Sequence, residues 1–134
     1  MDTTQATERA KAQAVAQLES IVEMVAALET ARAAQDDEAI EEAQQTIQED
    51  PLSIEVRSGW HNVGAPLEAA EYSILLCWGG PAVRIIGQLD NYGEPSSVRL
   101  QYQDWFTPWI EYIVVDDAQK AALLAYAREF YYGT

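Results

Sequence analysis

The chain has 134 residues, of which 49% are hydrophobic, and its 22 acidic and 8 basic side chains give a formal net charge of −14. This length and composition fit a single globular domain with a core of its own, whereas the charge disfavours direct binding to nucleic acid or to an anionic membrane surface. The apolar runs are far shorter than the roughly 18 residues that cross a bilayer. Because the polar segment Met1–Thr4 lacks the basic and apolar regions of a secretory signal, we expect a cytoplasmic protein.

Residues 1–50 are predicted to form acidic helices. They contain no Gly or Pro and are rich in Ala, Gln and Glu, which are compatible with helix. Pro51 ends this region. An apolar seam with the 4-3-4-3 spacing of a helix runs through its first half. The seam consists of Ala14, Leu18, Ile21, Val25 and Leu28.

A break in this helical region is predicted at Gln35-Asp36-Asp37, because an aspartate there can cap a second helix with an acidic first turn. Ile40, Ala43 and Ile47 then form the apolar side of that second helix. We therefore favour an acidic hairpin of two antiparallel helices over residues 1–50. The alternative is one uninterrupted helix, which would almost demand dimerisation through the seam.

Residues 51–115 are predicted to form an antiparallel sheet of three to five strands. Leu52, Ile54 and Val56 alternate with polar residues, which is the pattern of a half-exposed strand. Turns rich in Gly, Pro and Asn separate the apolar runs that follow. Those further predicted strands are residues 71–78, 82–90, 98–105 and 109–115.

A hairpin through residues 91–96 would sort the side chains of its two strands onto two faces. The apolar face, which we expect helices to cover, holds Val83, Ile85, Leu89, Val98, Leu100 and Tyr102. The polar face, which we expect to be open to water, holds Arg84, Gln88, Arg99, Gln101 and Gln103.

Residues 116–134 are predicted to form a C-terminal helix. Asp116 or Asp117 caps its start and Gly133 ends it. Its buried side is predicted to hold Leu123, Leu124, Ala127, Phe130 and Tyr131. The three segments together predict one domain of the α+β class over residues 1–134.

The residue types that carry catalysis in other proteins form no recognisable motif here. His61 is the only histidine, and Cys77 lies in the most apolar run, where a thiolate is costly. Asp104 and Glu111 could form a carboxylate pair, but a chain with 22 acids places one near any tryptophan. The Gly79-Gly80-Pro81 turn lacks the spacing of a phosphate-binding loop. We therefore predict a protein that is not an enzyme and uses no metal or cofactor.

The most unusual motif places Trp105, Phe106 and Trp109 around a Thr-Pro corner. Aromatic side chains in such a loop either plug the rim of a small core or form a patch for a partner. Trp60 and Trp78 lie at other predicted strand ends that could be nearby.

Three segments stand out as sequence signatures: Asp50–Val56 with Ser58-Gly59-Trp60, Gly79–Val83 and Gln103–Trp109. They resemble a group of small proteins from bacteria, their phages and other mobile elements, for which no shared activity or catalytic residue is established. The likeness covers about residues 50–134. It implies a genomic setting in which small acidic proteins often bind host proteins, among them anti-restriction and anti-CRISPR proteins that imitate the charge of DNA.

The sequence thus favours a binding protein whose acidic helices contact a basic surface of a nucleic-acid-binding host complex, since carboxylates along a helix can replace phosphates. The predicted partner-binding residues are Asp36, Asp37, Glu38, Glu41, Glu42, Glu49, Asp50, Trp105, Phe106 and Trp109. Two alternatives stay open. One is a homo-oligomer joined through residues 14–28, and the other is a small ligand-binding module at the Trp60–His61 loop and the Asp104–Trp109 corner.

Overall fold

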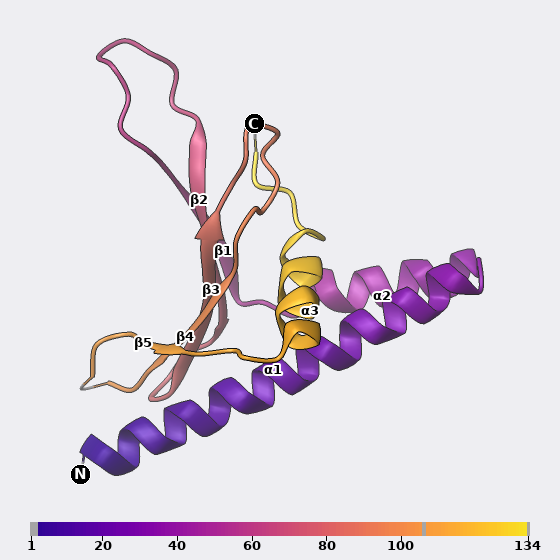
Figure 1. Cartoon of the computed structure of the whole chain (residues 1–134), viewed down its shortest axis with the longest axis horizontal. Helices are drawn as coiled ribbons and strands as arrows, with labels where there is room; N and C mark the ends of the chain where they lie inside the picture. Colours follow the sequence, from indigo (N-terminus) through magenta and orange to yellow (C-terminus); the bar gives the residue numbers. More distant parts are fainter. Residues whose placement is uncertain (1–2, 106, 134) are drawn as a thin grey trace.

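The computed structural model describes residues 3–105 and 107–133, which form three helices and five strands. A long and a short helix open the chain, the strands follow, and the third helix comes last (Figure 1). In chain order the elements are α1 (Thr3–Ala33), α2 (Asp37–Glu49), β1 (Ser53–Ser58), β2 (Ala69–Cys77), β3 (Ala82–Gln88), β4 (Arg99–Gln103), β5 (Ile110–Tyr112) and α3 (Asp117–Ala127). The fold is of the predicted α+β class.

The two N-terminal helices form the predicted hairpin. Gln35 adopts a left-handed backbone conformation, with a φ of 54°, in the turn between α1 and α2. The side chain of Asp36 accepts a hydrogen bond from the backbone nitrogen of Ala39 at 3.2 Å and so caps α2. The alternative of one uninterrupted helix is therefore wrong.

The apolar seam of α1 is buried in the core of this single chain, where α1 packs against α2, α3, β3 and β4. The side chains that are less than 5% exposed include all five predicted seam residues, Ala14, Leu18, Ile21, Val25 and Leu28. Self-association through these side chains would require the core to open. The seam therefore serves the folding of one chain.

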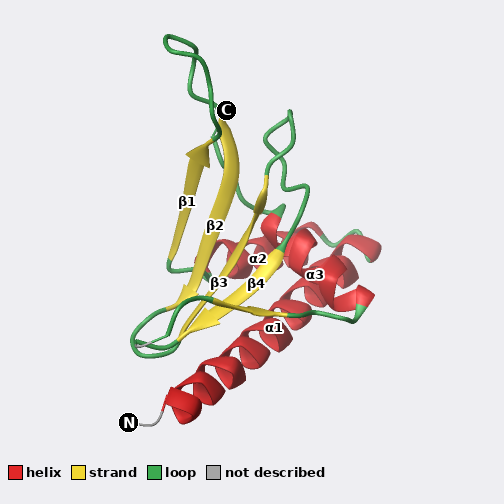
Figure 2. Ribbon diagram, turned by 60° about the vertical axis from the view of Figure 1, so that its left-hand side comes forward, coloured by secondary structure: helices red, strands yellow, loops and turns green. Residues whose placement is uncertain are grey.

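The five strands form one antiparallel sheet in the order β1-β2-β3-β4-β5, so each strand pairs with its neighbour in sequence. The helices lie on one face of the sheet and leave the other face open (Figure 2). Ile85 and Leu100 pair on the covered face, where both are buried, whereas Arg84 and Gln101 pair on the open face. The predicted division into an apolar and a polar face is confirmed.

The C-terminal segment differs from its prediction. The side chain of Asp116 caps α3 as expected, but the helix ends at Ala127 and does not continue to the end of the chain. The Tyr132 hydroxyl donates a hydrogen bond of 2.6 Å to the carbonyl oxygen of Ala127, which ties the following segment back onto the last turn. As a result Tyr132 is buried, and Tyr131, which was expected on the buried side, is exposed.

Candidate functional site

The end of the α1–α2 hairpin extends beyond the sheet and α3 (Figure 1). We call residues 29–50 the acidic arm, because they hold eight acidic side chains and one basic side chain. The basic one, Arg32, already pairs with Glu129 at 3.4 Å. The predicted partner-binding residues that lie exposed on the arm are Asp36, Asp37, Glu38, Glu41, Glu42 and Glu49. The structure thus gathers them on one projecting element.

Like charges stand next to one another along α2. Asp37 and Glu41 are four residues apart, and so are Glu38 and Glu42. Each such pair destabilises a helix by roughly 0.2–0.5 kcal/mol. Asp37 and Glu38 lie in the first turn, where the positive end of the helix dipole favours each by about 0.3–1 kcal/mol, but Glu41 and Glu42 gain nothing from the dipole. Asp36, Asp37 and Glu38 therefore stabilise the start of α2, whereas Glu41 and Glu42 add repulsion without stabilising the helix.

Three acids of the arm have partners within the chain. Asp36 caps α2, Asp50 accepts a hydrogen bond from the Tyr126 hydroxyl at 2.7 Å, and Glu49 accepts one from the Gln45 amide at 3.0 Å. The carboxylates that no described side chain neutralises include Asp37, Glu38, Glu41 and Glu42. These four are available to an external cation.

The aromatic corner between β4 and β5 is held by Asp104, whose side chain is 2% exposed. One of its carboxylate oxygens accepts a hydrogen bond from the backbone nitrogen of Trp105 at 2.7 Å, and the other lies 3.6 Å from the guanidinium of Arg9 in α1. Trp105 itself is exposed and lies against the β2–β3 turn, where its indole nitrogen would be 3.1 Å from a Cβ atom at Gly80. Phe106 lies outside the described residues.

Trp109 lies on the open face of the sheet, where the guanidinium carbon of Arg84 is 4.1 Å from the centre of its ring. Nε of Arg84 donates a hydrogen bond of 2.9 Å to the side-chain oxygen of Gln101, which is only 8% exposed. Burial lowers the pKa of Arg84, and the charges of Arg99 and Arg57 lower it further. Arg84 is thus a positioned positive charge with no carboxylate partner among the described residues.

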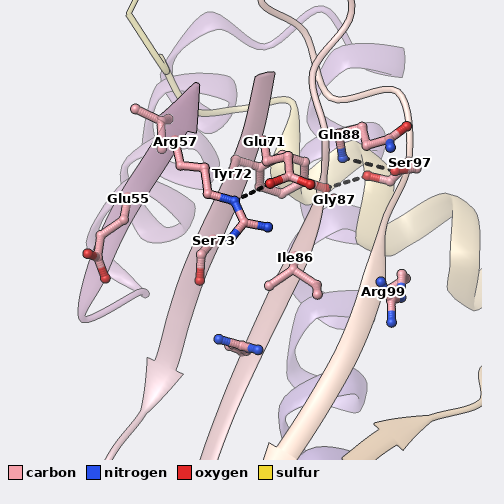
Figure 3. Close-up of a pocket in the computed structure, with 12 residues that line it drawn as sticks. Glu55, Arg57, Glu71, Tyr72, Ser73, Ile86, Gly87, Gln88, Ser97 and Arg99 are labelled. Atoms are coloured by element: carbon pink, nitrogen blue, oxygen red, sulfur yellow. Dashed lines mark hydrogen bonds and ion pairs between the residues drawn. The ribbon is translucent and has the colours of Figure 1, made fainter. Parts of the chain in front are cut away.

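A groove of about 420 Å³ crosses the open face beside this cluster (Figure 3). Arg57 and Arg99 lie on opposite sides of it (Figure 3). Each of them already has a carboxylate partner, because Arg57 pairs with Glu71 and Arg99 pairs with Glu111 at 2.5 Å. Arg84 therefore provides the guanidinium that remains for an anionic ligand.

The predicted partner-binding residues fall into two distant places. The aromatic corner lies near the N-terminal end of α1, whereas the acidic arm is at the other end of that helix (Figure 1). Arg9 contacts the corner and Arg32 belongs to the arm, and their separation of 23 positions corresponds to roughly 35 Å of helix. The two groups therefore do not form one continuous site.

The two halves of the predicted ligand module also lie apart. In an antiparallel meander, the β1–β2 and β3–β4 loops lie at one end of the sheet, and the β2–β3 and β4–β5 loops lie at the other. The Trp60–His61 loop is therefore at the opposite end of the sheet from the Asp104–Trp109 corner. Trp78, which follows β2, shares the corner's end. The prediction of one ligand site formed by both segments is therefore wrong, because the fold places them at opposite ends of the sheet.

The residues with catalytic potential are separated in the same way. His61 is exposed at one end of the sheet, whereas Cys77 lies at the other end, and burial raises the pKa of its thiol. Asp104 and Glu111 each pair with a different arginine. In the described part of the chain, no three His, Cys, Asp or Glu side chains come together in a way that could hold a metal ion.

Sequence reasoning does not predict the contact between Arg84 and Trp109, although it identifies both residues. A signal for the contact is present in the alternation of β5. Glu111 pairs with Gln101 on the open face, and Trp109 comes two residues earlier, so the period of two places it on the same face. Pairing the last predicted strand with its neighbour would therefore have found the contact.

Comparison with known proteins found no matching family model, no similar curated protein and no similar solved structure. Among the described residues, no helix combines the length and the hydropathy that a bilayer span needs.

Proposed function

We propose that this protein is a non-enzymatic binding protein that presents its acidic arm to a basic surface of another protein. The observation that carries the proposal is the set of exposed carboxylates on α2, which lie on a hairpin that extends beyond the rest of the domain (Figure 1). The proposed partner is a host protein that binds nucleic acid, so that the arm takes the place of phosphates at its Lys and Arg side chains. An inhibitor of a host defence complex would work in this way.

The charge of the arm sets the expected behaviour of such a complex. Opposite charges steer the two proteins together, and this attraction is screened over about 8–10 Å at physiological salt. Association is therefore expected to be fast and to weaken as the salt concentration rises. The net charge of −14 also repels nucleic acid itself, so the protein competes with DNA or RNA and does not bind it.

The proposal is tested by replacing Glu38, Glu41 and Glu42 with glutamine, which retains size and helix propensity and removes three charges. Tagged wild-type and variant proteins would capture partners from nuclease-treated bacterial lysate, and the affinity for the purified partner would then be measured at low and high salt. We expect the variant to lose on the order of tenfold to a hundredfold in affinity. Added double-stranded DNA should displace the wild-type protein from its partner.

A matched control replaces Glu8, Glu68 and Glu94 with glutamine. These three side chains are exposed and lie outside the arm, so the control removes the same charge without changing the proposed surface. Thermal unfolding would show that both triple variants keep the fold. Wild-type affinity in the arm variant, or an equal loss in the control, would show that the arm is not the binding surface.

A second candidate function rests on Arg84, since a guanidinium stacked on Trp109 can bind a carboxylate or phosphate group in the adjoining groove. Titration with inorganic phosphate and with succinate would be followed by the NMR shift of the Trp109 indole. The same titration of Arg84→Gln serves as the control. If neither anion shifts the wild-type signal more than that of the variant, the groove does not bind anions.

A further inference from the structure

The two edges of the sheet differ in how well they are protected against pairing with another chain. β5 has only three residues and follows Pro108, and both features discourage pairing. β1 has six residues without Pro or Lys and forms the outer edge of the sheet, where no described element covers its free side (Figure 2). The register shift beside Ser58 skips Ala70 on β2, so β1 itself is regular. It therefore presents an unbroken row of unpaired backbone groups.

The side chains along this edge are unusually apolar for an exposed strand. Val56 is 46% exposed within β1, and the residues that flank the strand, Leu52 and Trp60, are 62% and fully exposed. Extension of the strand by two residues at its end would place all three side chains on one face. On the other face, Glu55 and Arg57 carry opposite charges two residues apart. No described side chain neutralises Glu55. This edge thus combines free backbone groups, uncovered apolar side chains and two opposite charges, Glu55 and Arg57, on one face.

We propose that β1 is the interface at which two copies of this chain form a dimer, with their β1 strands antiparallel and related by a two-fold axis at Val56. In this register each residue faces the one that is equally far on the other side of Val56. Glu55 of each copy then faces Arg57 of the other, which also pairs with Glu71 of its own chain, and Leu52 faces Trp60. The pairing covers the exposed apolar side chains and forms two opposite-charge pairs across the strands.

The charges select this register over its neighbours. An axis at Glu55 or at Arg57 would place two like charges opposite each other, which is destabilising. An axis at Ile54 would place Arg57 opposite Pro51, which has no N–H to donate. The axis at Val56 forms both charge pairs at once, so β1 is self-complementary in one register.

Sedimentation of the wild-type protein tests the proposal first, with an expected mass of twice the 14.9 kDa of the chain. Glu55→Arg and Arg57→Glu should each weaken the dimer by roughly tenfold or more, because each places like charges opposite each other twice. An equal mixture of the two variants should form a heterodimer, since all the facing charges are then opposite. The double variant E55R/R57E should restore the homodimer.

Arg99→Glu is the matched control for Arg57→Glu. It makes the same charge change on the same face of the sheet and also breaks an ion pair with a glutamate, but it lies in β4, away from the β1 edge. Its dimer is expected to be as stable as that of the wild type. Circular dichroism would show that the reversals at exposed positions keep the fold.

A cysteine on the two-fold axis tests the register directly. Val56→Cys in a Cys77→Ala background should form a disulfide between copies under mild oxidation, since opposite Cα atoms lie about 4.5–5.5 Å apart, within disulfide range. Ser53→Cys in the same background should not, because Ser53 is six residues away from its own copy along the strand, or roughly 20 Å.

Three results would overturn the proposal. They are a monomeric wild-type protein at high concentration, a dimer that neither charge reversal weakens, and cross-linking at position 53 in place of position 56. The proposal is independent of the acidic arm, because E38Q/E41Q/E42Q should leave the mass of the dimer unchanged.

Discussion

Replacing Gly87 with alanine is expected to destabilise the fold at the floor of the groove. Gly87 lies opposite Tyr72 in the β2–β3 pair, and the segment before β4 passes close over it. An added Cβ atom would overlap the carbonyl oxygen of Ser97 and would lie 2.7 Å from the hydroxyl oxygen of Tyr72. Those two oxygens share a hydrogen bond of 2.6 Å, so the methyl group would drive them apart.

The size of the effect follows from three contributions. Moving backbone to relieve an overpacked methyl group costs about 1–3 kcal/mol. Loss of the hydrogen bond between Tyr72 and Ser97 adds about 0.5–1.5 kcal/mol. Alanine also restricts the unfolded chain, which offsets about 0.4–1 kcal/mol. The free energy of unfolding is therefore expected to fall by roughly 0.5–4 kcal/mol.

Urea unfolding followed by tryptophan fluorescence measures this change, with the denaturant slope compared to confirm two-state behaviour. Gly59→Ala is the matched control, because its Cβ would meet only the Cβ of Ala70 at an ordinary 3.6 Å. That variant is expected to stay within about 0.5 kcal/mol of the wild type or to be slightly more stable. Equal stability of the two alanine variants would refute the steric reasoning.

Three further predictions concern the core. Burial raises the pKa of Tyr72, Tyr126 and Tyr132 above the ordinary value of 10. Above pH 10 the unfolded chain therefore loses three protons that the folded chain keeps. The free energy of unfolding should then fall by about 4 kcal/mol per pH unit, or about 1.4 kcal/mol for each tyrosine. Urea midpoints measured from about pH 8 to pH 11 test this, and Tyr126→Phe should reduce the slope by about a third. Burial also raises the pKa of the Cys77 thiol, so Ellman's reagent should react with the folded protein at least several-fold more slowly than with the urea-unfolded protein, and equal rates would contradict this. Leu18→Glu should abolish cooperative unfolding, because a charge in a side chain that is 1% exposed costs several kcal/mol, and a folded Leu18→Glu monomer would contradict the burial of the seam.

Local signals in the sequence predicted most of the fold. The cap at Asp36 and the period-two runs after Pro51 act over a few residues, and the hairpin and the two faces of the sheet followed from them. The end of the last helix was missed because the helical period of its apolar residues runs on past Ala127. The hydrogen bond from Tyr132 that turns the chain back is a tertiary contact, which a periodic pattern does not contain.

The candidate site was also predicted only in part, because local signals reveal the acidic arm, whereas tertiary contacts decide the rest. The acids of the arm are neighbours in sequence, so their clustering could be read directly. The position of Trp60 relative to Trp105 depends on which end of the sheet each loop occupies. Counting the strands of the predicted meander shows which end of the sheet each loop occupies, whereas the amino-acid composition of the loops does not. The stacking of Arg84 on Trp109 follows only once β5 is paired with β4 in register, and the two residues are 25 positions apart in the sequence.

The acidic arm is firmly held on its inner side and free on its outer side. Ile47 is fully buried, the Gln48 amide donates a hydrogen bond to the carbonyl of Glu129, and the Tyr126 hydroxyl donates one to Asp50. A helix that served only to keep the protein in solution could place lysines between its glutamates, which would relieve the like-charge repulsion. Because the helix that carries the carboxylates is fixed before a partner arrives, binding would cost little backbone entropy. The repulsion retained at Glu41 and Glu42 and the fixed helix that carries them are two observations that support the proposal of a basic partner surface.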